Sequence, residues 1–449
     1  MGTANSALIE RDLRVLWHPC TQMKDHEWLP LVPIRRGEGV WLYDLDGNRY
    51  LDAISSWWVN LFGHAHPYIN QRIRDQLEQL EHVILAGFSH EPVVELSERL
   101  VELTPEPLTR CFYTDNGSSA VEVALKMSYH YWRNHGQPQK QRFITLSGSY
   151  HGETLGTLGV GDVALYKETY KPLLMEALTV PSPDCHAREP GVSWEAHSRE
   201  MFRHMEAALE AHAHETAAVI VEPLVQCATG MRMYHPVYLQ LLREACDRHG
   251  VHLIADEIAV GFGRTGTLFA CEQADICADF LCLSKGLTAG YLPLAVVLTT
   301  DNVFDAFYDD YASLRAFMHS HSYTGNPLAC TAALATLDLF RDSDVIGRNR
   351  ILAAHMAEAV APLAEHPNIG EIRQTGMILA MEMQQTDGRP FPFEERRGIR
   401  VYQHALTREA LLRPLGNVVY FMPPYVITEK QIDHLATVAA EGIERATRR

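Results

Sequence analysis

The chain has 449 residues, of which 47% are hydrophobic, and a formal net charge of −17. This length allows two or three domains with a large core. The acidic balance argues against nucleic acid or an anionic membrane as a main partner, because both of these bind basic protein faces.

The nine cysteines are scattered along the chain without a Cys-x-x-Cys pair. This pattern favours reduced thiols over a disulfide framework. The sequence also shows neither a secretory leader nor a run of ~18 apolar residues. We therefore expect a cytoplasmic protein that spans no membrane.

The N-terminal region, residues 1–65, is rich in turns. Apolar residues alternate on both sides of Asp46 and Gly47, and an Asp-Gly pair in this context predicts a β-hairpin. We interpret residues 1–65 as the N-terminal part of a small domain.

In residues 66–335, strand-like runs alternate with helical segments. The runs are residues 110–114, 142–146, 217–222, 251–255 and 280–283. Such alternation predicts an α/β domain, with a mostly parallel sheet covered by helices. One of its amphipathic helices is expected to extend from Ala120 to about Trp132.

A long Ala- and Leu-rich helix is predicted to follow Asn326 and Pro327. Asparagine is a good helix N-cap, and proline suits the first helical position. We expect this helix to lead into a C-terminal small α+β domain, residues 336–449.

Lys285 and Asp256 carry the most informative chemistry. Each follows or ends a short apolar run, and in a parallel sheet such strand ends meet at the crevice where ligands bind. A lysine amine there can condense with an aldehyde, and a buried aspartate can hold a pyridine nitrogen protonated. The pair predicts pyridoxal 5′-phosphate (PLP) as cofactor.

Gly117 and Ser118 lie between a predicted strand and a predicted helix. Free N–H groups at a helix N-terminus suit a phosphate, although the segment alone is equally typical of a capped helix. Tyr150 ends another strand, where it could stack on a cofactor ring or belong to the core. Trp57 and Trp58 could likewise line a pocket or pack inside.

Two further motifs resemble binding sites but are better explained without a ligand. Residues 261–266 fit G-x-G-x-x-G, but no helix follows directly and the segment does not succeed a first strand, which argues against a dinucleotide site. The paired histidines, such as His319 and His321, lack the spacing of metal ligands. We therefore expect no metal.

Residues 253–266 and 283–286 resemble the class III aminotransferases of PLP fold type I. Motifs around Trp17, Trp57, Met231, Gly325 and Arg413 resemble a subfamily of these enzymes, the 7,8-diaminononanoate synthases of biotin biosynthesis. The similarity extends from about residue 11 to the end. It implies an adenosylmethionine-8-amino-7-oxononanoate aminotransferase activity and a homodimer with active sites shared across its interface.

The resemblance also implies roles for the cofactor residues. Lys285 would be bound covalently to PLP, Asp256 would pair with the ring nitrogen, and Tyr150 would stack near the ring. Gly117 and Ser118 would bind the phosphate from one subunit. The residues expected to reach it from the other subunit are His321 and Ser322.

A second set of residues is implied for the substrates. Arg413 would bind the carboxylate of the keto acid through its planar guanidinium. The other residues of this set are Cys20, Trp57, Trp58, Tyr150, Lys285, Ser320 and Tyr420.

The amino donor is less firmly implied than the acceptor. Members that use S-adenosylmethionine often have tyrosine where this chain has Cys20, and residues 290–295 and 319–326 resemble relatives that use lysine. Two rivals remain: an ω-amino acid:pyruvate aminotransferase of the same class, and a non-catalytic PLP-binding regulator. The latter usually carries a DNA-binding or interaction segment, which we do not find in the sequence.

Overall fold

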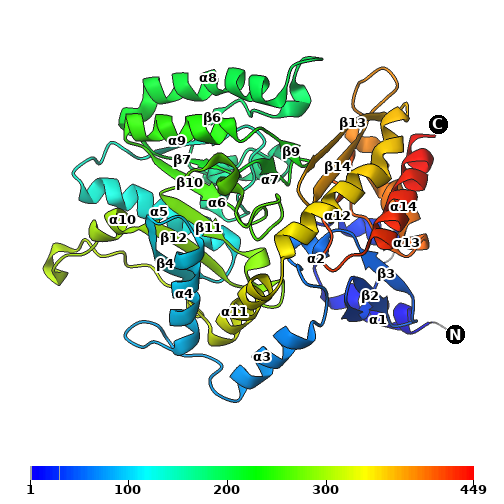
Figure 1. Cartoon of the computed structure of the whole chain (residues 1–449), viewed down its shortest axis with the longest axis horizontal. Helices are drawn as coiled ribbons and strands as arrows, with labels where there is room; N and C mark the ends of the chain where they lie inside the picture. The colour runs from blue at the N-terminus through cyan, green and yellow to red at the C-terminus, as the bar shows by residue number, and fades with distance from the viewer. Residues whose placement is uncertain (1–2, 30, 449) are drawn as a thin grey trace. The chain divides into compact units, whose positions relative to one another are not determined.

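The computed structural model describes residues 3–29 and 31–448, and Figure 1 traces the chain. Internal contacts divide the chain into two units. We call Tyr68–Ile351 with Arg373–Ile378 the large unit. The small unit comprises Met1–Pro67, Leu352–Ile372 and Leu379–Arg449. The domain boundaries at residues 65 and 335 remain predictions.

A seven-stranded sheet forms the centre of the large unit. In sheet order its strands are β4 (Leu108–Thr114), β12 (Ala295–Thr300), β11 (Phe280–Leu283), β10 (His252–Asp256), β7 (Thr216–Val221), β5 (Arg142–Leu146) and β6 (Leu178–Val180). Strand β12 is antiparallel to both of its neighbours, β11 and β4, and every other pair of adjacent strands is parallel. The predicted mostly parallel sheet is therefore confirmed, and all five predicted strands belong to it.

Strand β12 shows why one strand is reversed. It is separated from β11 by residues 284–294 only, and a parallel crossover needs about a dozen residues or more, usually with a helix. The short connection therefore returns the chain antiparallel to β11, with Leu283 opposite Val296.

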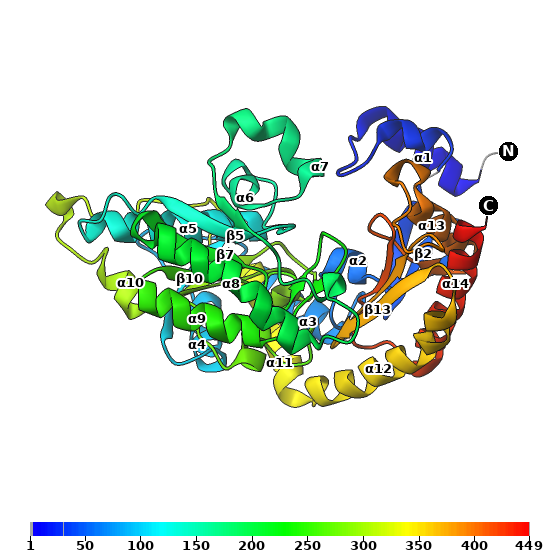
Figure 2. The same cartoon turned by 90° about the horizontal axis from the view of Figure 1, so that it is seen from above.

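Helices pack against this sheet. The elements of the large unit outside the central sheet are α4 (Glu91–Leu103), α5 (Gly117–Asn134), α6 (Leu155–Val160), α7 (Ala164–Lys167), β8 (Val225–Gln226), β9 (Arg232–Met233), α8 (Trp194–His212), α9 (Val237–His249), α10 (Asp301–Asp305) and α11 (Pro327–Asp342). Helix α5 crosses β4, β7, β10, β11 and β12, and its apolar face joins the core. Figure 2 shows α8 beside α9.

The starts of α5 and α11 depend on asparagine caps. The Asn116 side chain accepts the Ser119 N–H at 3.1 Å, so α5 begins at Gly117 rather than at the predicted Ala120. The Asn326 side chain accepts two N–H groups at 3.1 Å, and Pro327 opens α11. The predicted cap of this second helix is confirmed.

Lys140 lies just before β5 and is buried. Its ammonium donates to the carbonyls of Ala213, Thr216 and Gly250 at 2.9, 3.3 and 2.8 Å, and it lies 4.3 Å from the ring centroid of Trp132. Burial lowers the pKa of Lys140 to about 8. The side chain thus joins three segments of the chain, which carry Ala213, Thr216 and Gly250.

The small unit contains one complete sheet and most of a second. The first has the order β1 (Ile34–Glu38), β2 (Trp41–Asp44), β3 (Arg49–Asp52) and β15 (Ala410–Leu411); the second has β13 (Ile369–Thr375), β14 (Ile378–Met383) and β16 (Val418–Phe421). The last three residues of β13 and the first residue of β14 are assigned to the large unit. Strands β2 and β3 are antiparallel around Gly47, so the predicted hairpin is confirmed.

The remaining helices complete the fold. They are α1 (Ala4–Val15), α2 (Ser55–Trp58), α13 (Arg397–Thr407) and α14 (Glu429–Thr447) in the small unit. Helices α3 (Pro67–Leu77) and α12 (Val345–Val360) contain residues of both units.

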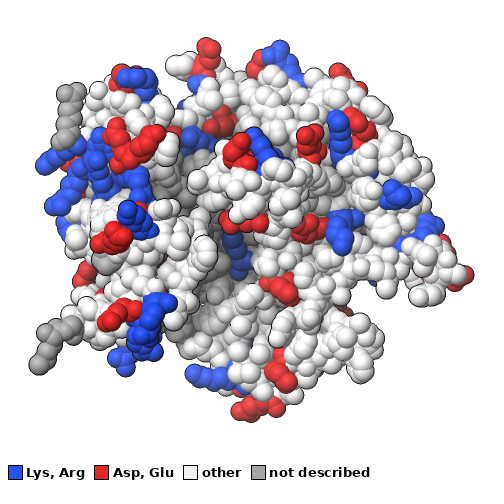
Figure 3. Space-filling model, turned by 180° about the vertical axis from the view of Figure 1, so that it is seen from behind, with Lys and Arg blue, Asp and Glu red and all other residues white. Residues whose placement is uncertain are grey.

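The surface charges, the cysteines and the helices can be compared with what the sequence composition predicts. Acidic and basic side chains are interspersed over the face drawn in Figure 3. All nine cysteines are free thiols. Within residues 3–29 and 31–448, every helix is too short or too polar to cross a bilayer.

Candidate active site

Lys285 follows β11 and opens a short 3₁₀ helix, Lys285–Thr288. Its φ of 46° lies in the left-handed region, which non-glycine residues adopt rarely and which is enriched at functional sites. The preceding Ser284 donates from its hydroxyl to the carbonyl of Leu294 at 2.8 Å. The backbone is therefore fixed where the lysine side chain leaves the strand.

Asp256 is the last residue of the neighbouring strand β10, opposite Cys282 of β11. Its side chain is 5% exposed. One carboxylate oxygen accepts the Ile258 N–H at 3.1 Å, and the other lies 2.7 Å from Nδ1 of the buried His151. The parallel register thus brings the ends of β10 and β11 together, as the sequence predicted.

Several ionisable groups surround the lysine amine. Burial lowers the pKa of Lys285, and the nearby groups of Cys227, Asp256 and Glu222 oppose this shift. A lowered pKa increases the neutral, nucleophilic fraction of the amine at a given pH. The environment therefore suits a lysine that reacts with an aldehyde.

Glu222 follows β7 on the other side of β10 and is buried. Burial raises the pKa of Glu222 to about 7. Its two oxygens accept the backbone N–H groups of Tyr150 at 2.9 Å and of Cys227 at 3.0 Å. This carboxyl group fixes the loop that carries Tyr150.

Tyr150 lies in the loop after β5 and is half-buried. Its hydroxyl donates to Glu153 at 2.9 Å, and its ring meets that of Tyr166 edge-on at 5.7 Å. The next residue, His151, is the one that contacts Asp256. Tyr150 and Asp256 are therefore linked through adjacent backbone positions.

The N-terminus of α5 forms a cradle with two glycines. A Cβ atom on Gly152 would lie 2.1 Å from the Ser118 hydroxyl, and one on Gly117 would lie 2.9 Å from the Ile258 side chain. Only glycine allows these approaches, which bring the start of α5 beside the Tyr150 loop and the segment after Asp256. Free N–H groups at a helix start favour a phosphate here.

The segment before α11 carries Ser320, His321 and Ser322. Nδ1 of His321 lies 3.6 Å from the Asp115 carboxylate of the same chain, just before α5. Its Nε2 is 3.0 Å from Nε2 of His319. Ser320 and Ser322 are exposed. Their predicted reach to a second subunit remains a prediction.

The small unit brings together four of the predicted substrate residues. The Trp58 indole donates to the Tyr420 hydroxyl at 3.0 Å, and both side chains are buried. Trp57 is 43% exposed, and the Arg413 guanidinium carbon lies 5.3 Å from its ring centroid. Cys20, also in this unit, is exposed.

Trp57 and Trp58 belong to a left-handed helical turn. The φ angles from Ser55 to Trp58 are 52°, 46°, 73° and 72°, and the Trp58 N–H donates to the carbonyl of Ile54 at 2.8 Å. Left-handed backbone costs roughly 1–2 kcal/mol per non-glycine residue, so the turn costs roughly 4–8 kcal/mol. Surrounding contacts must supply this free energy.

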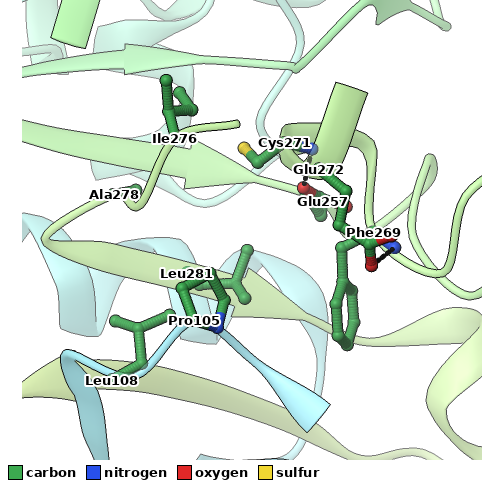
Figure 4. A pocket seen from close by; sticks show the side chains of 9 residues that line it. All are labelled: Pro105, Leu108, Glu257, Phe269, Cys271, Glu272, Ile276, Ala278 and Leu281. Atoms are coloured by element: carbon green, nitrogen blue, oxygen red, sulfur yellow. Dashed lines mark hydrogen bonds between the residues drawn. The ribbon is translucent and has the colours of Figure 1, made fainter. Parts of the chain in front are cut away.

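Glu257, next to Asp256, lines a largely apolar pocket (Figure 4). Its oxygens accept the N–H groups of Ala270 and Cys271 at 2.6 and 2.8 Å, and burial raises the pKa of Glu257 to about 7. The lining residues are Pro105, Leu108, Glu257, Phe269, Cys271, Glu272, Ile276, Ala278 and Leu281. None of these is a predicted cofactor residue, and we interpret Glu257 as a structural group.

Sequence reasoning missed three residues of these clusters: His151, Glu222 and Asp52. His151 adjoins Tyr150, and Glu222 ends an apolar strand as Asp256 does. The rule that selected Asp256 could therefore have selected Glu222. Asp52 follows the predicted hairpin, and nothing in its pattern indicates a role.

The large-unit cluster fits PLP. The buried Asp256 carboxylate, the lysine of lowered pKa and the glycine-lined helix start match a protonated ring nitrogen, an aldehyde and a phosphate, respectively. Lys285, Asp256, Tyr150, Gly117 and Ser118 would hold these groups.

Comparisons with known proteins also indicate a PLP-dependent enzyme. A family model described as aminotransferase class-III matches residues 22–442. A Helicobacter pylori protein named adenosylmethionine-8-amino-7-oxononanoate aminotransferase is 47% identical, and the match covers 94% of each chain.

Solved structures agree. The enzyme of that name from Methanocaldococcus jannaschii is 36% identical with a TM-score of 0.93, covering 99% of this chain and 100% of that one. A PLP-bound amine transaminase from an uncultivated Pseudomonas species is 32% identical with a TM-score of 0.90, covering 96% and 99%.

Fold and cluster together define a PLP-dependent transferase of fold type I. The chain belongs to the class III aminotransferase family. The predicted fold class, the cofactor and the aminotransferase activity are thereby confirmed.

Proposed function

We propose that this aminotransferase converts 8-amino-7-oxononanoate to 7,8-diaminononanoate, a step of biotin biosynthesis, with S-adenosylmethionine as amino donor. The observation that carries the proposal is the exposed Arg413 guanidinium, 5.3 Å from the Trp57 ring. A planar cation beside an apolar ring suits an acceptor with a carboxylate and a long methylene chain. The name of the Helicobacter pylori relative supports the same reaction.

In the proposed mechanism, bound PLP supplies an aldehyde for covalent bonding to amines and a ring that delocalises electrons released at the adjacent carbon. Lys285 would hold the cofactor, and its Nζ, once released, would take the proton from the carbon that bears the donor amine. The same atom would return a proton when the acceptor is aminated. Its lowered pKa favours the neutral form that accepts this proton.

The Asp256 carboxylate would pair with the ring nitrogen of bound PLP. The Ile258 N–H and His151 contact its two oxygens at 3.1 and 2.7 Å, which orients the carboxylate before the cofactor binds. A preoriented charge needs no reorganisation during the reaction. Tyr150 is proposed to stack near the ring, and Gly117 and Ser118 to bind the phosphate.

Arg413 is proposed to bind the acceptor carboxylate, and Trp57, Trp58, Tyr420 and Ser320 to shape the substrate site. Arg413 is exposed and therefore accessible to an anion. Its fork of N–H donors matches a carboxylate in a bidentate manner.

The proposed assembly is a cytoplasmic homodimer. In it, His321 and Ser322 of each subunit reach the phosphate bound by the other subunit. The segment before α11 supports this assembly, because it carries exposed large apolar side chains at Tyr308, Tyr311 and Met318, which an interface would cover.

Lysine is the second candidate for the donor. Cys20 is exposed at the position where donors with an adenine ring often meet tyrosine, and a thiol offers little stacking area. We nevertheless favour S-adenosylmethionine, because relatives that are 47% and 43% identical to this chain are named for it.

The test is a half-reaction assay with the purified, PLP-loaded protein. Loss of the cofactor's absorbance band is followed by stopped flow with S-adenosylmethionine and with lysine at equal concentration, and 8-amino-7-oxononanoate is then added. The proposal expects bleaching by S-adenosylmethionine and recovery with the keto acid. Bleaching by lysine alone would overturn the donor, and failure of the keto acid to restore the band would overturn the acceptor.

A further inference from the structure

The left-handed turn from Ser55 to Trp58 is held by one carboxylate. Oδ1 of the fully buried Asp52 accepts the N–H groups of Ile54 at 3.2 Å and Ser56 at 3.0 Å. Its Oδ2 accepts the Ser56 hydroxyl at 2.7 Å and lies 3.1 Å from Nε2 of His64. Asp52 therefore bonds to the residue before the left-handed turn and to the second residue of the turn.

His64 is itself fixed in place. Its Nδ1 lies 3.3 Å from the side-chain amide nitrogen of Asn60, whose oxygen accepts the Gly63 N–H at 2.7 Å. A Cβ on Gly37 would lie 2.5 Å from the His64 Cβ, so the imidazole occupies space that only glycine leaves. With the amide nitrogen donating to Nδ1, Nε2 carries the hydrogen that His64 donates to Asp52.

The turn is also tied to the strands beside it. The Ser55 hydroxyl donates to the carbonyl of Met422 at 2.7 Å, and the Trp58 indole donates to Tyr420. Strand β15 runs parallel to β3, with Leu411 opposite Asp52. Arg413 therefore leaves β15 next to the strand end from which the turn begins.

The handedness of the turn separates the two tryptophans. Trp58 is 3% exposed and packs edge-on against Tyr420, whereas Trp57 is 43% exposed beside Arg413. A right-handed turn would place these consecutive side chains in other directions, because the sense of rotation about the helix axis would be reversed. The exposed pair thus depends on the left-handed backbone.

We propose that Asp52, assisted by His64, is a positioning residue for acceptor recognition: it holds the left-handed turn that sets Trp57 against Arg413. The inference rests on the proposed function, since it assumes that Arg413 binds the acceptor carboxylate. Asp52 itself acts only through Trp57 and Arg413.

The first test compares Asp52→Ala and Asp52→Asn with wild type in steady-state and half-reaction kinetics. Alanine removes every contact, whereas asparagine keeps an oxygen for the two N–H groups. We expect the KM for 8-amino-7-oxononanoate to rise about tenfold or more in Asp52→Ala and less in Asp52→Asn. The half-reaction with donor alone should stay within about twofold of wild type. Asp387→Asn, an exposed aspartate of the same unit, is the matched control.

A second readout needs no cofactor. In apo-protein labelled with 5-fluorotryptophan, Trp57→Phe assigns the Trp57 signal in the fluorine NMR spectrum. This signal should move or broaden in Asp52→Ala while most other tryptophan signals remain. An unchanged Trp57 signal, an unchanged KM, or an equal loss in both half-reactions would overturn the positioning role.

A fallback variant covers a failure of Asp52→Ala to fold, and the fluorine spectrum separates the role of Asp52 from the proposed function. If Asp52→Ala does not fold, Ser56→Ala removes a single hydrogen bond, and a KM rise of about threefold is expected; no rise would overturn the proposal. If wild type fails to aminate the keto acid, the proposed function fails, whereas the fluorine spectrum still decides whether Asp52 holds the turn.

Discussion

The cofactor cluster of the large unit and the Trp57–Arg413 pair of the small unit are built in opposite ways. Asp256 and Lys285 end or follow straight parallel strands and are mostly buried, so regular secondary structure orients them. Trp57 and Arg413 are exposed, and Trp57 lies on a left-handed turn. Regular strands thus carry the chemical groups, and a strained segment displays the groups proposed for selection.

This comparison predicts that changes in the large unit affect the chemical step and changes in the small unit affect acceptor recognition. The following variants test that separation, from the largest expected effect to the smallest.

Lys285→Ala should have the largest effect. Transamination should fall roughly a thousandfold or more, because a positioned acid–base group typically contributes about 10²–10⁴ in rate. Borohydride should fix PLP to Lys285 in wild type but leave it removable from the variant, as peptide mapping can show. Lys171→Ala, at an exposed lysine, should behave as wild type. A label on another lysine would contradict the assignment.

The second prediction concerns stability and pH. Burial raises the pKa of Glu222 from 4.5 to about 7. Between these values the folded protein keeps a proton that the unfolded chain has lost, so the free energy of unfolding should fall as pH rises. The shift corresponds to about 3 kcal/mol.

Urea unfolding from pH 4.5 to 7.5 measures this fall. In Glu222→Gln the free energy of unfolding should fall less steeply with pH than in wild type. Glu78→Gln, at an exposed residue, should show the same dependence on pH as wild type. An identical slope in Glu222→Gln would show that Glu222 ionises normally in the folded protein.

Asp256→Asn should keep the fold and slow proton abstraction ten- to more than a hundredfold. A neutral amide cannot hold the ring nitrogen protonated, and a hydrogen bond to a charged group contributes ~1.5–3 kcal/mol. Single-turnover absorbance measures the rate. Asp275→Asn, at an exposed aspartate in the same unit, is the control. A wild-type rate in Asp256→Asn would exclude this role.

How much of this architecture the sequence predicts depends on backbone regularity. An apolar run that ends in a polar residue identifies Asp256 and the strand before Lys285, because burial and strand length leave a clear pattern. Four consecutive left-handed residues without a glycine leave no such pattern, since Asp52 and His64 stabilise them through contacts made only in the fold. His151 was missed for the same reason: its partner, Asp256, is 105 positions away.

Arg413→Ala tests the prediction that changes in the small unit affect acceptor recognition. The KM for 8-amino-7-oxononanoate should rise about ten- to a hundredfold, because the acceptor carboxylate loses its cation. The reaction of the cofactor with small amines should change much less. The exposed Arg400 of the same unit provides a control, Arg400→Ala. Equal effects on both half-reactions would indicate that Arg413 is structural.

The smallest effect is expected for the donor. Cys20→Tyr should tighten the apparent affinity for S-adenosylmethionine several-fold, since aromatic stacking contributes ~0.5–1.5 kcal/mol, and should leave lysine unaffected. Cys20→Leu adds apolar area without a ring and should give little change. Improved binding of lysine by Cys20→Tyr would argue against a stacked adenine.

A protein that handles a reactive aldehyde must also protect its other amines. Lys140 has a pKa of about 8, low enough to make an accessible amine a competitor for pyridoxal. Its ammonium instead donates to three carbonyls and lies against an indole. These contacts stabilise the protonated form, which has no lone pair to react with an aldehyde. In this chain, two features favour reaction at one lysine: the amine of Lys285 lies at the end of β11, where its pKa is lowered, and the amine of Lys140 is bound to carbonyl groups before β5.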